Sequence, residues 1–232
     1  MTISTHFLAL IVGLIYPAYS VLTHKRTNKR IKSDDYFRLL DYKQTIFLFW
    51  ILTFIVLGHS LIDKSIPLNF YPTFNTIGIV MAVLILIFIV LQIVTSKVKT
   101  TEKASSILER MKDIYHYLPK SKREFNWFNA LSLSAGLCEE IIFRLFLFSY
   151  LIESTNLFLA LIITNVVFAL THIGTGKKNL GGAFILGSVF TAIYYFTNNI
   201  WLAMILHSAI DISVGFLSYA SYNIIKATKK KD

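Results

Sequence analysis

The chain alternates between long apolar stretches and shorter polar, basic gaps. The apolar stretches are residues 3–22, 44–62, 75–95, 127–152, 156–173, 180–197 and 200–222. Each is close to the roughly 20 residues that a helix needs to cross the hydrocarbon core. Because a backbone in lipid must satisfy its own hydrogen bonds, each stretch is predicted to be a helix. The pattern predicts an all-α, polytopic transmembrane helical bundle of about seven spans, or eight if the last one is split.

Composition supports a membrane environment. Apolar residues make up 55% of the 232 residues, charged residues only 16%, and the mean hydropathy is +0.59. A soluble domain carries about 25% charged residues, so the apolar surplus is expected to face lipid. The net charge of +10 does not indicate nucleic-acid binding, because the cations lie in the gaps between apolar stretches. Cys138 is the single cysteine, which excludes an intramolecular disulfide.

The gaps also predict the orientation of the chain. Alternate gaps hold seven Lys and Arg in 23–43, eight in 96–126, two in 174–179 and four in 226–231. The opposite side holds only Lys64, and Arg144 lies inside a span. The positive-inside rule therefore predicts that the N-terminus is outside and the C-terminus is in the cytoplasm. Residues 1–22 resemble a signal peptide, but their positive charges follow the apolar run, which favours an uncleaved first span.

Four regions follow from this division. Residues 1–96 are an N-terminal three-span region, 97–126 a basic cytoplasmic segment, 127–222 a four-span core and 223–232 a basic tail. In 97–126, apolar side chains recur at helical spacing, namely Ile107, Leu108, Met111, Ile114, Tyr115 and Leu118. This periodicity predicts an amphipathic helix on the cytoplasmic membrane surface, ended by Pro119.

Ionisable residues inside the spans are concentrated in the C-terminal half. The first three spans hold only His6 and His59, near their ends. The later spans hold Glu139, Glu140, Arg144, His172, His207 and Asp211. A charged side chain at mid-membrane costs about 2.5–3.5 kcal/mol even on a lenient scale, so such a cluster predicts a functional site.

The spacing of these residues suggests different roles. Glu140 and Arg144 stand four residues apart and are expected to form a structural ion pair. Glu139 is rotated by about 100° on the same helix, away from that pair, which makes it a candidate general acid or base. His207 and Asp211 share a second helix face and can point into one cavity.

Three motifs carry a family resemblance. They are Glu139-Glu140-Ile-Ile-Phe-Arg144, Phe168-x-x-x-His172 and His207-x-x-x-Asp211. Their order and spacing resemble the EExxxR, FxxxH and Hxxx(N/D) motifs of the CAAX-protease and bacteriocin-processing family, also called the Abi family. That family includes the type II CAAX prenyl endopeptidases. The resemblance covers about residues 125–222.

The resemblance implies an intramembrane, metal-independent glutamate-type endopeptidase that needs no cofactor. Glu139 with His172 would activate a water molecule, and His207 with Asp211 would face the developing oxyanion. Asp211 replaces the commoner Asn, and an ionised carboxylate cannot donate a hydrogen bond, so it is expected to hold His207. The implied structural and supporting residues are Glu140, Arg144, Phe168 and Asn165, the last of which lies two turns before His172 on the same face.

Alternatives remain at this point. Glu139, His172, His207 and Asp211 are residue types that bind zinc, although the chain has no HExxH helix. Cys138 could act as a nucleophile with a histidine. A non-catalytic scaffold or a bacteriocin self-immunity protein would bind a peptide without cleaving it.

The expected partners are the bilayer and a membrane-associated peptide or protein. Candidate substrates are a leader, a signalling peptide, a bacteriocin or a CAAX-like C-terminus. The expected location is a bacterial cytoplasmic membrane, with the site in its cytoplasmic half.

Two features of the later spans make further predictions. On straight helices Glu139 and His172 would differ in depth by roughly 10 Å, so either the fourth span begins after residue 133 or the helices tilt. Small residues on the sixth span predict a close-packing seam, namely Gly181, Gly182, Ala183, Gly187, Ser188 and Thr191.

Overall fold

The computed structural model of the chain describes residues 1–229, and these contain helices but no strand. The N-terminal helices are α1 (Ile3–Leu10), η1 (Ile11–Ile15), α2 (Tyr16–Ser33), α3 (Asp35–Ile62), α4 (Thr76–Thr95), α5 (Thr101–Arg110) and η2 (Lys112–Ile114). The C-terminal helices are α6 (Lys122–Glu139), η3 (Glu140–Phe148), α7 (Ser149–Ser154), α8 (Leu157–Thr171), η4 (Ile173–Thr175), α9 (Lys177–Thr197) and α10 (Ile200–Thr228). Residues 230–232 of the predicted basic tail lie outside the described residues.

Five of the described helices are long and apolar enough to cross a membrane. They are Ile3–Ser33, Asp35–Ile62, Thr76–Thr95, Lys178–Thr197 and Ile200–Thr228. The other two predicted spans correspond to the shorter apolar α8 and to the run formed by α6, η3 and α7. That run carries the buried charges. The expectation of an all-α, polytopic membrane bundle is confirmed.

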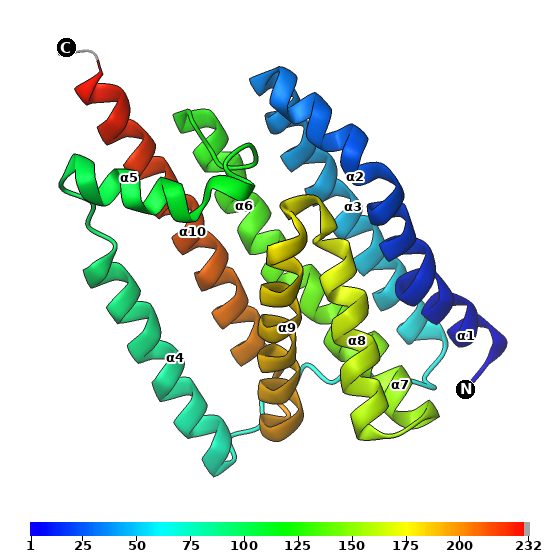
Figure 1. Ribbon diagram of the computed structural model, residues 1–232. Coiled ribbons are helices and arrows are strands. Elements are labelled where there is room, and N and C mark those ends of the chain that lie inside the picture. Colours follow the sequence, from blue (N-terminus) through cyan, green and yellow to red (C-terminus); the bar gives the residue numbers. More distant parts are fainter. Residues whose placement is uncertain (230–232) are drawn as a thin grey trace.

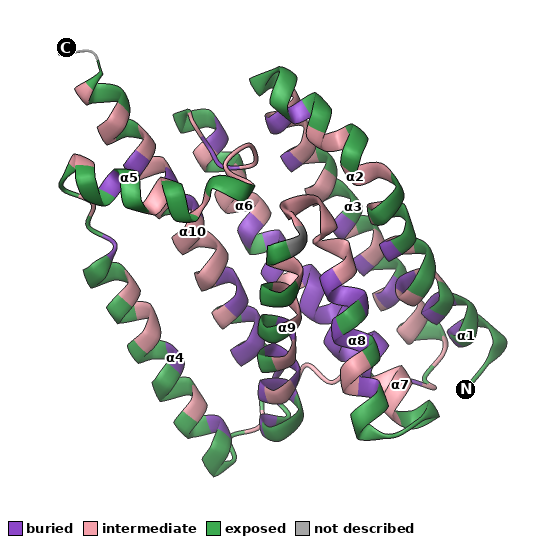
Figure 2. Ribbon diagram, in the orientation of Figure 1, coloured by how far each residue is buried: buried purple, intermediate pink, exposed green. Residues whose placement is uncertain are grey.

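The helices lie side by side, and the two termini are at opposite ends of the bundle (Figure 1). The run from α6 to α7 passes through the middle, where α6 packs against α3 and α10 and η3 packs against α8 and α9. Helix α4 stands at one edge and packs mainly against α9 and α10 (Figure 1). Buried residues gather along α6 and η3, whereas α4 is mostly exposed (Figure 2). The orientation of the bundle across the membrane stays a prediction.

The central helix begins earlier than its hydropathy suggests. It starts at Lys122, not at residue 127, because Ser121 and Glu124 form a capping box. The Glu124 carboxylate is buried and accepts a hydrogen bond from Arg38 Nη2 of α3 at 2.8 Å. A buried, paired glutamate therefore extends the helix into a stretch whose composition is polar.

The segment before it departs from the predicted amphipathic helix. Helix α5 ends at Arg110, well before Pro119, and only the short η2 follows. The carbonyl of His116 accepts a hydrogen bond from Arg38, and that of Tyr117 accepts one from the Tyr42 hydroxyl. These tertiary hydrogen bonds, together with the burial of Leu118, replace the helical pattern that periodicity favoured.

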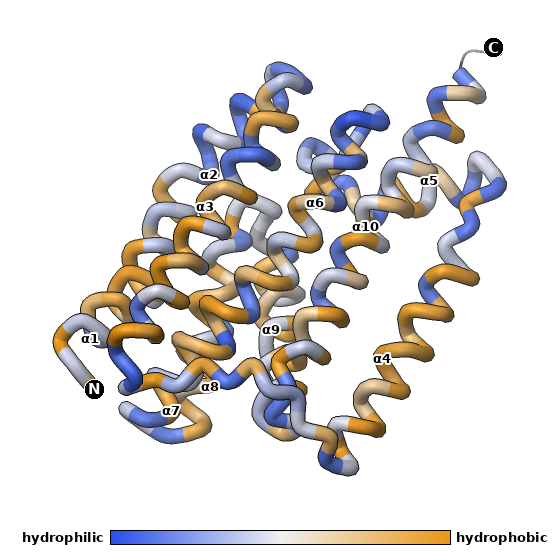
Figure 3. Tube along the Cα trace, turned by 180° about the vertical axis from the view of Figure 1, so that it is seen from behind, coloured by the Kyte–Doolittle hydropathy of each residue, from blue (hydrophilic) through white to orange (hydrophobic). Residues whose placement is uncertain are grey.

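The turn between α8 and α9 is recessed into the bundle. In Figure 1 it lies below the upper ends of α2, α3 and α6, and the hydrophilic ends of these longer helices extend past it (Figures 1 and 3). Asn28 of α2 donates a hydrogen bond to the carbonyl of Gly174 in this turn, at 2.8 Å. The expected difference in depth between Glu139 and His172 is therefore not explained by a later start of α6. The short α8 ends inside the bundle, beside η3.

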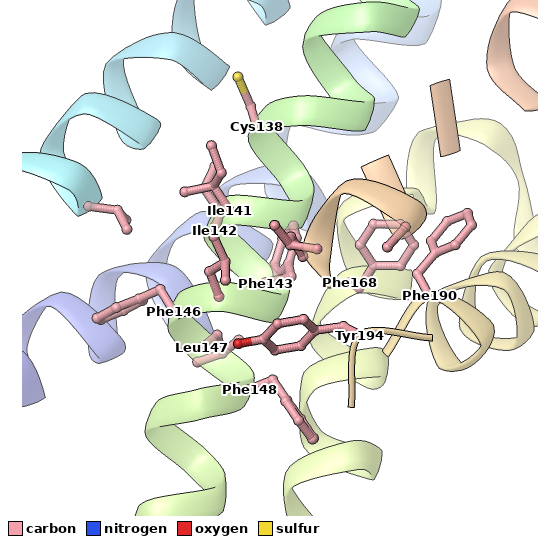
Figure 4. Close-up of a cluster of buried hydrophobic side chains, with 14 of the residues drawn as sticks. Cys138, Ile141, Ile142, Phe143, Phe146, Leu147, Phe148, Phe168, Phe190 and Tyr194 are labelled. Carbon is pink, nitrogen blue, oxygen red and sulfur yellow. The ribbon is translucent and has the colours of Figure 1, made fainter. Parts of the chain in front are cut away.

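The core is built around η3, a π-helical segment whose nine residues are all buried. Ile142, Phe143 and Leu145 have no exposed surface, and Phe143 packs edge-on against Phe168 of α8 with ring centroids 5.4 Å apart. Figure 4 shows this cluster reaching Phe168, Phe190 and Tyr194. Because every residue of η3 is buried, other helices must surround it, so η3 lies at the centre of the bundle.

Candidate active site

A buried ion pair stands at the start of η3. Glu140 and Arg144 have no exposed surface, and Arg144 Nη1 lies 3.2 Å from Glu140 Oε1. Arg144 Nη2 donates to the carbonyl of Gly187 on α9 at 3.1 Å. Its guanidinium also covers the ring of Phe168 at 4.4 Å from the centroid. The cation is therefore held by three elements, and its charge is directed to Glu140.

Glu140 has a second partner that the motif spacing did not suggest. His207 Nδ1 on α10 lies 2.8 Å from the same Oε1 atom. Because an ionised carboxylate only accepts hydrogen bonds, Nδ1 is the donor and the ring orientation is set by Glu140. The His207 ring also stacks on Phe190, with centroids 4.7 Å apart and an interplanar angle of 15°.

The other nitrogen of His207 faces two more carboxylates. Nε2 lies 3.6 Å from Glu139 Oε2 and 3.7 Å from Asp211 Oδ2. These separations are longer than a hydrogen bond. Within residues 1–229 the Glu139 carboxylate, in a residue only 3% exposed, has no hydrogen-bond partner. Asp211 is the most open member, with 36% of its side chain exposed.

His172 lies at the C-terminal cap of α8, immediately before the recessed turn. Its Nδ1 is 3.0 Å from the carbonyl of Phe168, which can only accept, so Nδ1 is the donor and Nε2 is free in the neutral ring. The Phe168 ring contacts both histidines, with centroids 4.7 Å from His172 and 6.1 Å from His207. Among the described residues no hydrogen bond or ion pair joins His172 to Glu139.

Asn165 is fully buried and supports this arrangement from α8. Its Nδ2 donates to the carbonyl of Leu161 at 2.9 Å, and its Oδ1 accepts from Thr191 Oγ1 of α9 at 3.2 Å. A Cβ at Gly187 would lie 2.7 Å from Asn165 Oδ1 and 2.9 Å from Phe168. The predicted seam on the sixth span therefore exists at Gly187. At Gly181 and Gly182 it is wrong, because nothing lies within 4 Å of a Cβ there.

Gly136 is a site-forming residue that the sequence reasoning missed. It lies one helical turn before Glu139, and a Cβ there would stand 2.8 Å from the backbone nitrogen of Ser208. The contact brings α6 and α10 into close approach next to His207. The run Ser134-Ala135-Gly136 was the available signal, since small residues mark close helix crossings in membranes.

The structure also bears on the two alternative mechanisms, which use a cysteine nucleophile or a metal ion. Cys138 is buried, and its sulfur points away from Phe168 and Phe190 (Figure 4). Across residues 1–229, no group of three or more His, Cys, Asp and Glu side chains has a geometry that could hold a metal ion.

Comparison with known families then identifies this part of the chain. Residues 122–213 match the family described as "Type II CAAX prenyl endopeptidase Rce1-like", and all three motifs lie inside the match. Residues 122–213 therefore resemble the CAAX protease family. The matched region, called the CAAX protease region below, begins at the first residue of α6 and ends within α10. The larger division at residues 96, 126 and 222 stays a prediction.

One curated relative resembles part of this chain. It is a protein of Bacillus subtilis (strain 168) named "Putative membrane peptidase YdiL", 36% identical over 76 residues. The match covers 33% of this chain and 30% of that relative. No solved structure matches the chain.

Proposed function

We propose that this chain is an intramembrane endopeptidase that hydrolyses a membrane-associated peptide with a water molecule activated by Glu139 and His172. The observation that carries the proposal is the convergence of Glu139, Glu140 and Asp211 on His207 inside the CAAX protease region. Three carboxylates and an arginine are costly to place inside a membrane, so a cluster of them indicates a functional site.

Glu139 and His172 are suited to proton transfer. Arg144 is occupied by Glu140 and Gly187, so the Glu139 carboxylate has no strong ion pair and stays available as a base. In the proposed step Glu139 accepts a proton from water while the water oxygen attacks the peptide carbonyl carbon. His172, whose Nε2 carries no proton in the neutral ring, assists Glu139 in removing this proton from water. The same proton later passes to the leaving amine as the C–N bond breaks.

His207, supported by Asp211, is suited to stabilising the negative charge that develops on the substrate oxygen. Glu140 fixes the His207 ring so that Nε2 faces Glu139 and Asp211. A protonated Nε2 would donate to the oxyanion that appears only in the transition state, and such a fixed donor is most effective where water is excluded. Asp211 would stabilise the imidazolium. Its exposed side chain marks the side from which a peptide would enter.

The proposed substrate is a peptide at the cytoplasmic half of a bacterial cytoplasmic membrane. The hydrophilic helix ends and the recessed turn lie at one end of the bundle (Figure 3). These ends carry the Lys and Arg residues that the positive-inside rule assigns to the cytoplasm. A leader or signalling peptide fits this position. The proposal requires no cofactor.

The proposal is tested by cleavage of candidate peptides by the full chain purified in detergent, with fragments identified by mass spectrometry. Glu139→Gln and His172→Ala are each expected to lower the rate by about 100-fold or more, because a general acid–base catalyst contributes 10²–10⁴-fold. Glu109→Gln removes a carboxylate that is 70% exposed and serves as the matched control with an unchanged rate.

Three results would overturn the assignment. Activity that survives in Glu139→Gln but not in Cys138→Ala would assign the nucleophile to the thiol. Activity that chelation removes and zinc restores would assign it to a metal. Peptide binding without cleavage, equal in wild type and Glu139→Gln, would make the chain a non-catalytic binding protein.

A further inference from the structure

A cavity lies at the C-terminal end of α2, outside the carboxylate cluster. The positive-inside rule assigns this end of α2 to the cytoplasm. Its volume is about 520 Å³. One wall comes from α2, with His24, Lys25, Asn28, Lys29 and Lys32, and the other from the recessed turn, with Ile173, Gly174 and Gly176. The α2 residues follow helical spacing and so share one face of that helix.

The lysines of this cavity have no protein partner. In the described part of the chain, Lys25, Lys29 and Lys32 make no ion pair, no hydrogen bond and no contact over an aromatic ring. Some other basic side chains are engaged, such as Lys112 with Glu109 at 2.5 Å and Lys43 over the ring of Trp127 at 4.8 Å. Three uncompensated positive charges therefore face one hollow.

A smaller cavity of about 300 Å³ continues the first. It shares Asn28, Lys32, Gly174 and Gly176 and adds Asp113, His116 and Lys178. Burial, reinforced by the nearby charges of Lys32, Lys120 and Arg38, lowers the pKa of His116 to about 4, so this ring is neutral at pH 7. Among the described residues, Asp113 is the single carboxylate that lines either cavity, and the joint space is strongly positive.

The wall between α2 and the turn is held in place by hydrogen bonds. Asn28 Nδ2 donates to the Gly174 carbonyl at 2.8 Å, and the Tyr117 hydroxyl donates to Asn28 Oδ1. The cavity therefore lies between two elements, α2 and the turn, that hydrogen bonds hold together. Its turn wall begins at Ile173, the residue after His172.

The depth of the cavity indicates what it binds. Its first lysine on α2, Lys25, follows shortly after the apolar stretch 3–22, and at this position in a span we expect it at the level of the bilayer phosphates. Anionic lipids of the cytoplasmic leaflet attract basic clusters at this position, and basic pockets between spans bind phosphate-bearing head groups. We propose that this cavity is a binding site for the phosphate head group of an anionic phospholipid of the cytoplasmic leaflet.

This site is separate from the proposed peptidase reaction, and its test does not need enzymatic activity. The full chain is purified in a neutral detergent and titrated with short-chain phosphatidylglycerol or phosphatidylcholine, and bound lipid is counted by native mass spectrometry. The wild type is expected to prefer phosphatidylglycerol by about tenfold or more, since each basic residue near an anionic surface contributes about fivefold.

Two variants separate the cavity from general surface charge. The Lys25→Gln, Lys29→Gln, Lys32→Gln variant is expected to lose the preference for phosphatidylglycerol. The Arg26→Gln, Lys97→Gln, Lys99→Gln variant removes the same charge outside both cavities and is expected to keep it. Circular dichroism of each variant confirms that the helices are intact.

Several outcomes would overturn the proposal. An equal loss in both variants would show that the attraction is diffuse. An unchanged preference in the cavity variant would place the lipid elsewhere. Full displacement of phosphatidylglycerol by millimolar inorganic phosphate, or by an acidic peptide but not by another anionic lipid, would assign the cavity to a ligand other than lipid.

Discussion

Helix α4 and the run of α6 and η3 are both apolar stretches of spanning length, yet they occupy opposite environments. On α4, Leu86 and Ile93 are 61% and 66% exposed, and the helix packs mainly against α9 and α10. On η3, all nine residues are buried. Figures 2 and 3 show α4 as a mostly exposed, largely hydrophobic helix at the edge of the bundle.

The contrast follows from the solvent. Lipid tails are as apolar as leucine, so an apolar side chain gains little by leaving lipid for another helix. Helix α4 lacks charged side chains and has little that requires a protein partner. The α6 and η3 run has Glu139, Glu140 and Arg144, which must be paired or shielded, and Gly136, which permits a close crossing. In this bundle, polar and small residues mark the interior helix.

The largest expected effect comes from breaking the buried ion pair. Arg144→Ala leaves Glu140 buried without its cation and should cost about 3–5 kcal/mol, so little folded protein should be recovered from membranes. Folded yield is measured by size-exclusion chromatography in detergent.

A double variant provides the control for that experiment. Glu140→Gln with Arg144→Met removes both charges, and neutral replacement of a buried pair is often tolerated. It should restore folded yield but not peptidase activity, because His207 loses its charged acceptor. A double variant as poorly folded as Arg144→Ala would contradict the ion-pair explanation.

Packing at the centre should matter next. Leu145 on η3 has no exposed surface, and Leu145→Ala removes a well-packed side chain at a cost of about 2–4 kcal/mol. Unfolding in mixed detergent micelles measures this free energy. A loss below about 0.5 kcal/mol, within the range of surface substitutions, would mean that η3 is less tightly packed than described.

The helix crossing at Gly136 tests the geometry of the site. Gly136→Ala places a Cβ against Ser208 and should cost about 1–3 kcal/mol as α6 and α10 separate. Activity should fall further than stability, because His207 moves with Ser208. Gly58→Ala is the matched control, since no atom lies within 4 Å of a Cβ there. Equal effects at the two glycines would refute the role of the crossing.

The smallest effect is expected on α4. Leu86→Ala, at a lipid-exposed position, should change stability by no more than about 0.5 kcal/mol in the same assay as Leu145→Ala. A loss as large as at Leu145 would show that α4 packs against further protein in the membrane, and the contrast between the two helices would disappear.

Predictions from the sequence were correct where a local pattern has only one physical explanation. The apolar stretches predicted the helical membrane bundle, and three spaced motifs predicted the family. In the segment 97–126 the sequence pattern predicted a helix that reaches Pro119, but α5 ends at Arg110, and the carbonyls of residues 116 and 117 accept hydrogen bonds from α3. It also placed the start of the central helix too late, because the burial of Glu124 depends on Arg38, far away in the chain.

By itself, the sequence determined the membrane environment, the helical class and the set of ionisable residues carried by the later spans. These properties depend on length, hydropathy and spacing, which are local. Only the tertiary structure decided that Glu140 serves both Arg144 and His207, that Gly136 lets α10 approach, and that the lysines of α2 face a hollow beside the turn after His172. Such contacts depend on which helix faces join, and no single segment encodes that choice.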